Sequence, residues 1–261
     1  MVNSRKIGIG VITYNRPEFY RKVIESLPKN TSYHSVVVND GVNRYALTSD
    51  ADTVIFNDSQ LGVSKTKNRA IRCLIEHRCT DLFLFEDDVF VKNPDVFQQY
   101  IDVSDISNIP HLCFGPVEIT KKYQTNLKLT CMYSTTLGVD LYHNPQGGLM
   151  YFNLNLIDEE DCVFDEQYQN AFEHIDVAYN LISKNVMPPF WYFPDIHNSI
   201  DYLESIPTSS ALSTITNKDQ YNQNVNNSAA YFIKKWGKFT NQIPDVSKDF
   251  VTQTLKAIKN G

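Results

Sequence analysis

Three consecutive carboxylates, Glu86-Asp87-Asp88, are the residues whose type and spacing point most directly to chemistry. They follow the mostly apolar run 81–85, and another apolar run begins at Val89. A short continuous apolar run predicts a strand buried on both faces of a parallel sheet, and ligands of such sheets bind beyond the carboxyl ends of the strands. Adjacent acids at a partly desolvated strand end repel one another, and a cation bound between them offsets this repulsion. Oxygen ligands suit Mg²⁺ or Mn²⁺, and the ion would be shared with substrate phosphates. The alternative interpretation of the three acids is a solvated acidic turn.

The apolar pattern of residues 7–88 predicts the elements that position these acids. Strands are expected at residues 7–13, 35–38, 54–56 and 81–85, and helices from Pro17 and over residues 64–76. This order predicts a nucleotide-binding α/β half with a parallel core. Right-handed crossovers would gather the polar turns on one edge of the sheet. Neither GxGxxG nor GxxxxGK[ST] occurs, so the motifs support neither a dinucleotide fold nor a P-loop kinase.

The second half of the chain is less regular. The Gly147-Gly148 pair leads into an expected strand, and backbone there can approach a ligand closely. Further expected elements are strands at 111–118 and 190–193, and helices within 165–183 and over 218–236 and 247–259. We expect one domain, in which residues 201–261 form a helical extension that packs on the rest or mediates self-association.

Length, charge and cysteine usage limit the possible classes of protein. The 261 residues can bury one full α/β core. A net charge of −6 argues against a large nucleic-acid footprint, although a nucleic-acid acceptor stays open. Five scattered cysteines without a CxxC favour reduced thiols. Because no signal peptide or membrane-length apolar run is found, we expect a soluble, cytoplasmic protein.

Four segments in order resemble the family-2-like glycosyltransferases with a GT-A fold. The first three are the turn Thr13-Tyr14-Asn15-Arg16-Pro17, the strand end Asn39-Asp40-Gly41 and residues 60–68, which match N-x-G-x-S-x-A-R-N in part; Glu86-Asp87-Asp88 stands for the DxD element. The resemblance covers about residues 5–200. It implies an α/β fold of GT-A type, a Rossmann-like mixed sheet flanked by helices. Residues 1–200 would be the catalytic domain, with a nucleotide-binding half up to about residue 90 and an acceptor half after it.

The resemblance also implies a role for each matched residue. Asp88 would hold the divalent ion on the donor diphosphate, with His197 as a further ligand. Asp40 would bind the base, and Asp87 or Glu86 the ribose. Lys67, which the helical pattern puts on a polar surface, replaces the family's arginine near the phosphates. The remaining residues of the expected nucleotide-sugar site are Thr13, Asn15, Arg16, Gly62, Asn68 and Gly148.

The expected catalytic base departs from the family pattern. Inverting members carry a Glu-Asp pair at a helix start, and alignment puts His174 where that Asp belongs. A histidine can act as a general base near neutral pH, while Glu173 and Asp176 lie within one helical turn of it. The acceptor, a carbohydrate or another hydroxyl compound, is expected over Gly147-Gly148 and residues 121–140, with Trp191 for stacking.

Two other functions fit part of the pattern. A nucleotidyltransferase also uses strand-end acids and a metal, but the turn at residues 13–17 lacks the Gly-rich basic loop usual in that class. A catalytically inactive glycan- or nucleotide-sugar-binding module would explain the missing Asp at His174.

Overall fold

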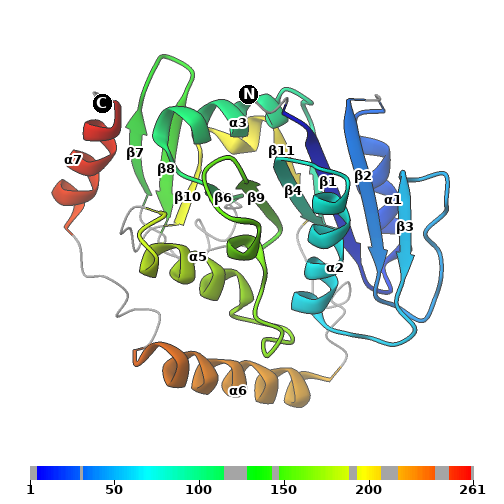
Figure 1. Cartoon of the computed structure of the whole chain (residues 1–261). Helices are drawn as coiled ribbons and strands as arrows, with labels where there is room; N and C mark the ends of the chain where they lie inside the picture. The colour runs from blue at the N-terminus through cyan, green and yellow to red at the C-terminus, as the bar shows by residue number, and fades with distance from the viewer. Residues whose placement is uncertain are drawn as a thin grey trace.

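A six-stranded sheet with helices on both faces forms the centre of the molecule (Figure 1). The structure is a computed structural model and describes residues 5–29, 32–114, 128–142, 147–187, 193–206, 217–238 and 247–259. The strand order is β3-β2-β1-β4-β9-β6. The four parallel strands are β1 (Ile7–Thr13), β2 (Tyr33–Asn39), β3 (Thr53–Phe56) and β4 (Asp81–Glu86). β9 (Leu149–Asn153) runs antiparallel to both β4 and β6 (His111–Cys113).

β4 is buried on both faces, as its apolar run predicts. Successive side chains of a strand point to opposite faces. Leu84 faces the helix α2 (Val63–Glu76), because a Cβ added at Gly10 would lie within 3.6 Å of the side chains of Leu84, Ala70 and Leu74. Phe83 and Phe85 face the other side, where their rings lie 4.9 and 6.3 Å from Phe97 of α3 (Val96–Ser107).

The register of the parallel strands brings their polar ends together. Thr13 of β1 pairs with Asn39 of β2, and Ile12 pairs with Glu86 of β4. The turns after these strands therefore meet at one edge, the edge toward which the strand arrows point in Figure 1.

Two smaller sheets and the remaining helices complete the fold. An antiparallel sheet has the order β10 (Phe193–Ile196), β8 (Gly138–Tyr142), β7 (Lys128–Met132), and β11 (Leu203–Ser205) pairs with β5 (Val89–Val91). The other helices are α1 (Pro17–Ser26), α5 (Glu173–Ser183), α6 (Lys218–Trp236) and α7 (Lys248–Lys259), with 3₁₀ turns η1 (Glu159–Cys162) and η2 (Ser199–Asp201).

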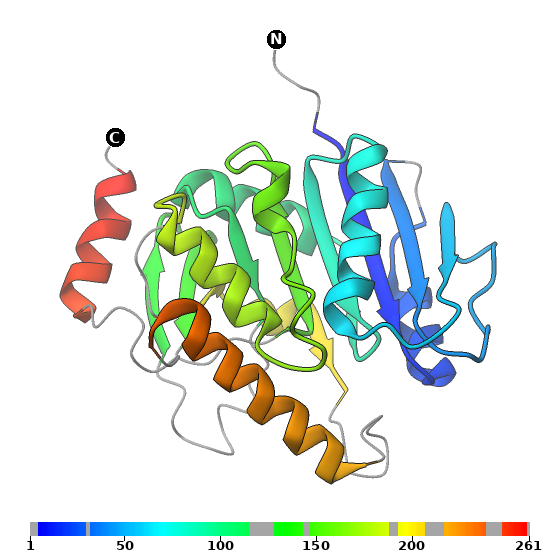
Figure 2. The same cartoon turned by 60° about the horizontal axis from the view of Figure 1, so that its bottom comes forward.

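The two C-terminal helices pack on different parts of this body. α6 crosses beside α5 (Figure 2), where the ring of Phe232 lies 5.8 Å from that of Phe172 and 6.1 Å from that of Tyr179. α7 packs on α3 and β7 and buries Val251 and Leu255. Self-association through these helices stays a prediction.

Most elements expected from the sequence are confirmed. The helix expected within residues 165–183 begins at Glu173, and the segment before it bonds to α2: Val63 N–H donates to Gln169 O at 2.9 Å. Phe172, with φ of 73°, ends that segment. The apolar pattern did not assign α3. Residues 115–127 and 188–192, with Trp191 and parts of two expected strands, lie outside the described residues. Among the helices described, none combines the length and hydropathy of a membrane span.

Candidate active site

A cleft of about 640 Å³ lies at the carboxyl ends of β1, β2 and β4, bordered by the start of α6. Segments far apart in the sequence meet there, because the parallel strands end at one edge of the sheet. The predicted site residues that line it are Thr13, Arg16, Asp40, Gly62, Glu86, Asp87, Asp88, Gly148, Glu173 and His174.

Asp87 is the buried centre of the acidic cluster. Its side chain is 2% exposed and accepts hydrogen bonds from the Thr13 hydroxyl at 2.6 Å and the Tyr14 N–H at 3.3 Å. The guanidinium of Arg16 forms an ion pair with its other oxygen. Asp87 therefore fixes the turn after β1 and orients Arg16 rather than presenting a free carboxylate.

Asp88 borders the cleft with a partly exposed carboxylate. Arg16 Nη1 lies 3.2 Å from its Oδ2, and the side chain remains 17% exposed. Burial, followed by the neighbouring charge of Glu86, raises the pKa of Asp88 to about 6, although Arg16 opposes this shift. Burial also raises the pKa of Asp87 against the effect of Arg16. Arg16, which is shared by Asp87 and Asp88, thus leaves the charge of these two carboxylates incompletely compensated, which favours a further cation in the cleft.

Asp40 organises the loop that leads into α2. Its Oδ1 accepts from Asn57 Nδ2 at 2.6 Å and from Leu61 N–H at 2.8 Å, and its Oδ2 accepts from Gly62 N–H at 3.1 Å. Gly62 has φ of 88°, and a Cβ there would lie 3.0 Å from the carbonyl oxygen of Gln169. The loop therefore requires glycine at this position.

Lys67 lies beneath the cleft rather than on a polar surface, so that part of the sequence-based prediction is wrong. Its side chain is 1% exposed, and Nζ lies 2.9 Å from Glu86 Oε1 and 3.2 Å from Glu173 Oε1. Burial opposes its charge, but the two carboxylates outweigh burial and raise the pKa of Lys67 above its ordinary value. Burial likewise disfavours ionised Glu173, but Lys67 and then His174 hold the pKa of Glu173 below its ordinary value.

Glu173 connects this buried ion pair to His174. Its Oε1 lies 3.1 Å from His174 Nδ1, and the His174 side chain is 19% exposed. The hydrogen-bond network assigns the proton to Nδ1, which donates to the carboxylate and leaves Nε2 as an acceptor. Gly147 lies directly against this group, because a Cβ there would be 3.4 Å from both His174 Nδ1 and Lys67 Nζ.

Five predicted site residues do not line the cleft: Asn15, Lys67, Asn68, Asp176 and His197. Asn15 follows β1 with φ of 53°, and its Oδ1 would lie 2.5 Å from a Cβ at Gly41, so it joins the turns after β1 and β2. Asn68 donates to Phe164 O at 2.9 Å and accepts from Phe164 N–H at 2.8 Å. It therefore attaches α2 to the segment that precedes α5.

Asp176 anchors α6. Its carboxylate accepts from Tyr168 O–H at 3.0 Å, Lys235 Nζ at 2.8 Å and Trp236 Nε1 at 2.7 Å. His197 lies on the second sheet, where Nδ1 is 3.0 Å from Asp140 Oδ1. The roles predicted for both residues from the family pattern stay predictions, and neither side chain borders the cleft.

The sequence did not identify the contribution of α6 to the cleft. Asn217, Gln220, Tyr221 and Asn224 line it. Their spacing of i, i+3, i+4 and i+7 places them on one helical face, so a stripe of amides on a helix was the available signal.

Comparison with known proteins identifies the fold. No protein-family model and no curated protein sequence matches the chain. Solved structures do: the mannosyltransferase PcManGT from Pyrobaculum calidifontis, in complex with GDP-Man and Mn²⁺, has a TM-score of 0.57 at 14% identity over 98% of this chain and 74% of that one. S. aureus TarS has a TM-score of 0.53 at 14% identity over 98% of this chain, which spans 43% of the length of TarS. TarS 1–349 in complex with UDP gives 0.52 at 13% identity, over 98% and 71% of the two chains. The chain has the GT-A fold.

The GT-A fold expected from the sequence is therefore confirmed, and its strand-end cleft is the one described above. The acids there suit a hard divalent ion. Asp88 offers a partly exposed carboxylate with a raised pKa, and a cleft of about 640 Å³ leaves room for phosphate and water as further oxygen ligands. Asp87 is already occupied by Thr13, Tyr14 and Arg16, so Asp88 is the better ligand of the pair.

Proposed function

We propose that this chain is a glycosyltransferase, which moves a sugar from a nucleoside diphosphate sugar to a hydroxyl group with the aid of Mg²⁺ or Mn²⁺. The observation that carries the proposal is the crowded acid cluster at the end of β4, where Asp88 opens into the cleft. A cation shared by Asp88 and a diphosphate relieves the repulsion within the cluster. The Mn²⁺ and GDP-Man in PcManGT and the UDP in TarS 1–349 support the same ligand class.

On the donor side, residues of the parallel half would bind the base, the ribose and the diphosphate. Among the described residues, Asp40 Oδ2 accepts one hydrogen bond, from Gly62 N–H, which leaves a lone pair of that oxygen for the base. Glu86, 29% exposed, is the more accessible of the two candidates for the ribose, since Asp87 is buried. Arg16 lies beside Asp88 and supplies positive charge to the diphosphate. A bound divalent ion would stabilise the charge that develops on the leaving diphosphate.

His174 is the proposed general base. Its Nδ1 proton is held by Glu173, which leaves Nε2 to accept the proton of the acceptor hydroxyl. The acceptor oxygen then bonds to the anomeric carbon while the bond from that carbon to the diphosphate oxygen breaks. Direct displacement of this kind inverts the anomeric configuration. Glu173 acts as a positioning residue, and Lys67 keeps it ionised.

The acceptor is proposed to be a saccharide. The face of α6 that borders the cleft carries the amides of Asn217, Gln220 and Asn224 and the ring of Tyr221. Amides both donate to and accept from hydroxyl groups, and an aromatic ring packs on the CH face of a pyranose. This face adds no basic residue to the cleft lining, so it supports a neutral acceptor better than a nucleic acid.

The deciding experiment measures nucleoside diphosphate release from a panel of nucleotide sugars in the presence of Mn²⁺. We expect turnover with at least one donor, and its loss in Asp88→Asn. Asp58→Asn is the matched control, because the Asp58 side chain is 96% exposed. Release of pyrophosphate from a nucleoside triphosphate and a sugar 1-phosphate, without nucleoside diphosphate release from any donor, would instead indicate a nucleotidyltransferase. Nucleotide-sugar binding without turnover would indicate an inactive binding module.

The compartment is proposed to be the cytoplasm. Four of the five cysteines, Cys73, Cys79, Cys113 and Cys162, are free and buried, which supports a reducing environment.

A further inference from the structure

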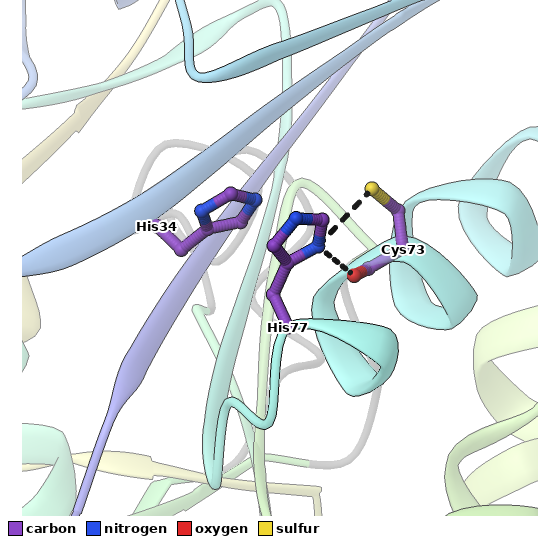
Figure 3. A group of neighbouring side chains, drawn as sticks. All are labelled: His34, Cys73 and His77. Carbon is purple, nitrogen blue, oxygen red and sulfur yellow. Dashed lines mark hydrogen bonds between the residues drawn. The ribbon is translucent and has the colours of Figure 1, made fainter.

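Two histidines and a cysteine lie next to one another near the amino end of β2 (Figure 3). His34 comes from the start of β2, and Cys73 and His77 come from the last turns of α2. One ligand atom from each lies within 4.8 Å of the others. We propose that these three residues bind a thiophilic metal ion such as Zn²⁺, at a site independent of sugar transfer.

The free nitrogens of the two imidazoles support metal binding. His77 Nδ1 lies 2.8 Å from the Cys73 carbonyl oxygen, so this nitrogen carries the proton and Nε2 keeps a lone pair. His34 Nε2 is buried without a hydrogen-bond partner among the described residues, and the His34 ring lies next to that of His77 in Figure 3. His34 Nδ1 is 3.9 Å from Asp52 Oδ2. Ligating histidines usually direct their second nitrogen at a carbonyl or carboxylate in this way.

The separation of the ligand atoms is close to that of a bound ion. Bond lengths of about 2.0–2.3 Å to Zn²⁺ place tetrahedral ligand atoms roughly 3.4–3.7 Å apart. Because the ligand atoms lie within 4.8 Å of one another, the group has to contract by up to about 1.4 Å. The two rings are stacked at 3.7 Å with an angle of 16°, so one ring must also turn. His77 is the exposed member, at the C-terminal cap of α2, and is the residue free to do so.

Topology separates this group from the acidic cleft. His34 precedes Asn39 by five residues along β2, which corresponds to roughly 16 Å. Cys73 lies ten residues after Val63 at the cleft end of α2, about 15 Å along the helix. The two groups also differ in chemistry, since a thiolate with imidazoles selects Zn²⁺ or copper, whereas carboxylates select Mg²⁺ or Mn²⁺.

A metal at this position would tie β2 to α2, the two elements whose other ends shape the cleft. On binding, the Cys73 thiol loses its proton to solvent and ligates as the thiolate. The expected consequence is a more stable fold in the presence of Zn²⁺.

The test uses Co²⁺ and Zn²⁺ alone, without nucleotide sugar. Co²⁺ bound by a thiolate gives a near-ultraviolet charge-transfer band, which the carboxylates of the cleft cannot produce. We expect this band to saturate at one equivalent, to disappear when Zn²⁺ is added, and to be absent from Cys73→Ser. It should persist in Asp88→Asn and in Cys162→Ser, a control in which the hydroxyl can keep the bond from Cys162 Sγ to Glu159 O.

A thermal melt gives a second readout. Zn²⁺ should raise Tm by several degrees in the parent chain and leave Tm unchanged in Cys73→Ser; should that variant fail to fold, the partly exposed His34→Gln replaces it. Absence of the band in the parent chain, or its persistence in the ligand variants, overturns the proposal. Neither result depends on whether the chain transfers a sugar.

Discussion

Replacement of Lys67 by methionine removes the cation that holds two carboxylates beneath the cleft. Methionine fills a similar volume, so the main change is the loss of charge next to Glu173, whose side chain is 4% exposed. Removing one partner of a buried ion pair costs about 3–5 kcal/mol, since the other charge remains buried. Glu86 contributes less, because at 29% exposure water can solvate it. We therefore expect Lys67→Met to lose about 3–5 kcal/mol of unfolding free energy at pH 7.

Urea unfolding over a range of pH identifies the cause of this loss. In the parent chain the pKa of Glu173 is lowered, so its stabilisation is complete above the ordinary pKa of 4.5 and is lost as the pH falls through the folded-state value. The pKa of Lys67 is raised, so its contribution is complete below 10.5. In Lys67→Met, the burial that favours protonation of Glu173 is no longer opposed by Lys67, although His174 still opposes it, so the deficit relative to the parent chain should shrink between pH 7 and pH 5.

A second substitution and a surface control complete this test. Lys67→Met combined with Glu173→Gln should recover part of the lost stability, because no buried charge then lacks a partner. Lys65→Met removes an exposed lysine of the same helix and should change stability by no more than about 0.5 kcal/mol. The reasoning fails if Lys67→Met costs less than about 1 kcal/mol, or if the double variant is no more stable than the single one.

Three further predictions concern the residues around the cleft. His174→Gln should lower kcat by about 10²–10⁴-fold with unchanged nucleotide affinity in calorimetry, whereas a proportional loss of affinity would make His174 a binding residue. Asp176→Asn should lower the urea midpoint, because Lys235 and Trp236 lose a charged acceptor and the free energy of unfolding falls by about 1–3 kcal/mol. If the folded variant instead loses turnover as fully as His174→Gln, Asp176 is the base. Mn²⁺ affinity should fall as the pH drops through about 6, where Asp88 takes up a proton. Titration calorimetry at pH 5 and pH 7.5 measures this change, and equal affinities at the two pH values would show that Asp88 is not a ligand.

The sheet and the acidic edge could be predicted from the sequence, because both follow from local patterns. The apolar run before Glu86 has the length and continuity of a strand covered on two faces, and parallel strands must end at a common edge. Helix α6 was also predictable, with the same bounds, from its periodicity. The missed α3 lies at residues 96–107, after the short strand β5.

The inner arrangement of the site could not be predicted, because it depends on contacts between distant segments. Lys67 has polar neighbours in sequence, but the segment that precedes α5 covers this face of α2 and pairs Lys67 with Glu173. The same holds for Asp176, whose position in a first helical turn resembled that of a catalytic acid. Its partners, Lys235 and Trp236, lie about sixty residues away in the chain.

The most direct test of the account is titration calorimetry of UDP and GDP into the protein with and without Mn²⁺. We predict that at least one of the two binds only in the presence of Mn²⁺, and that Asp88→Asn abolishes this binding while Asp58→Asn preserves it. Binding of equal strength to Asp88→Asn, or no binding of either nucleotide to the parent chain with Mn²⁺, would contradict the claim that the acids at the end of β4 hold a metal–diphosphate donor.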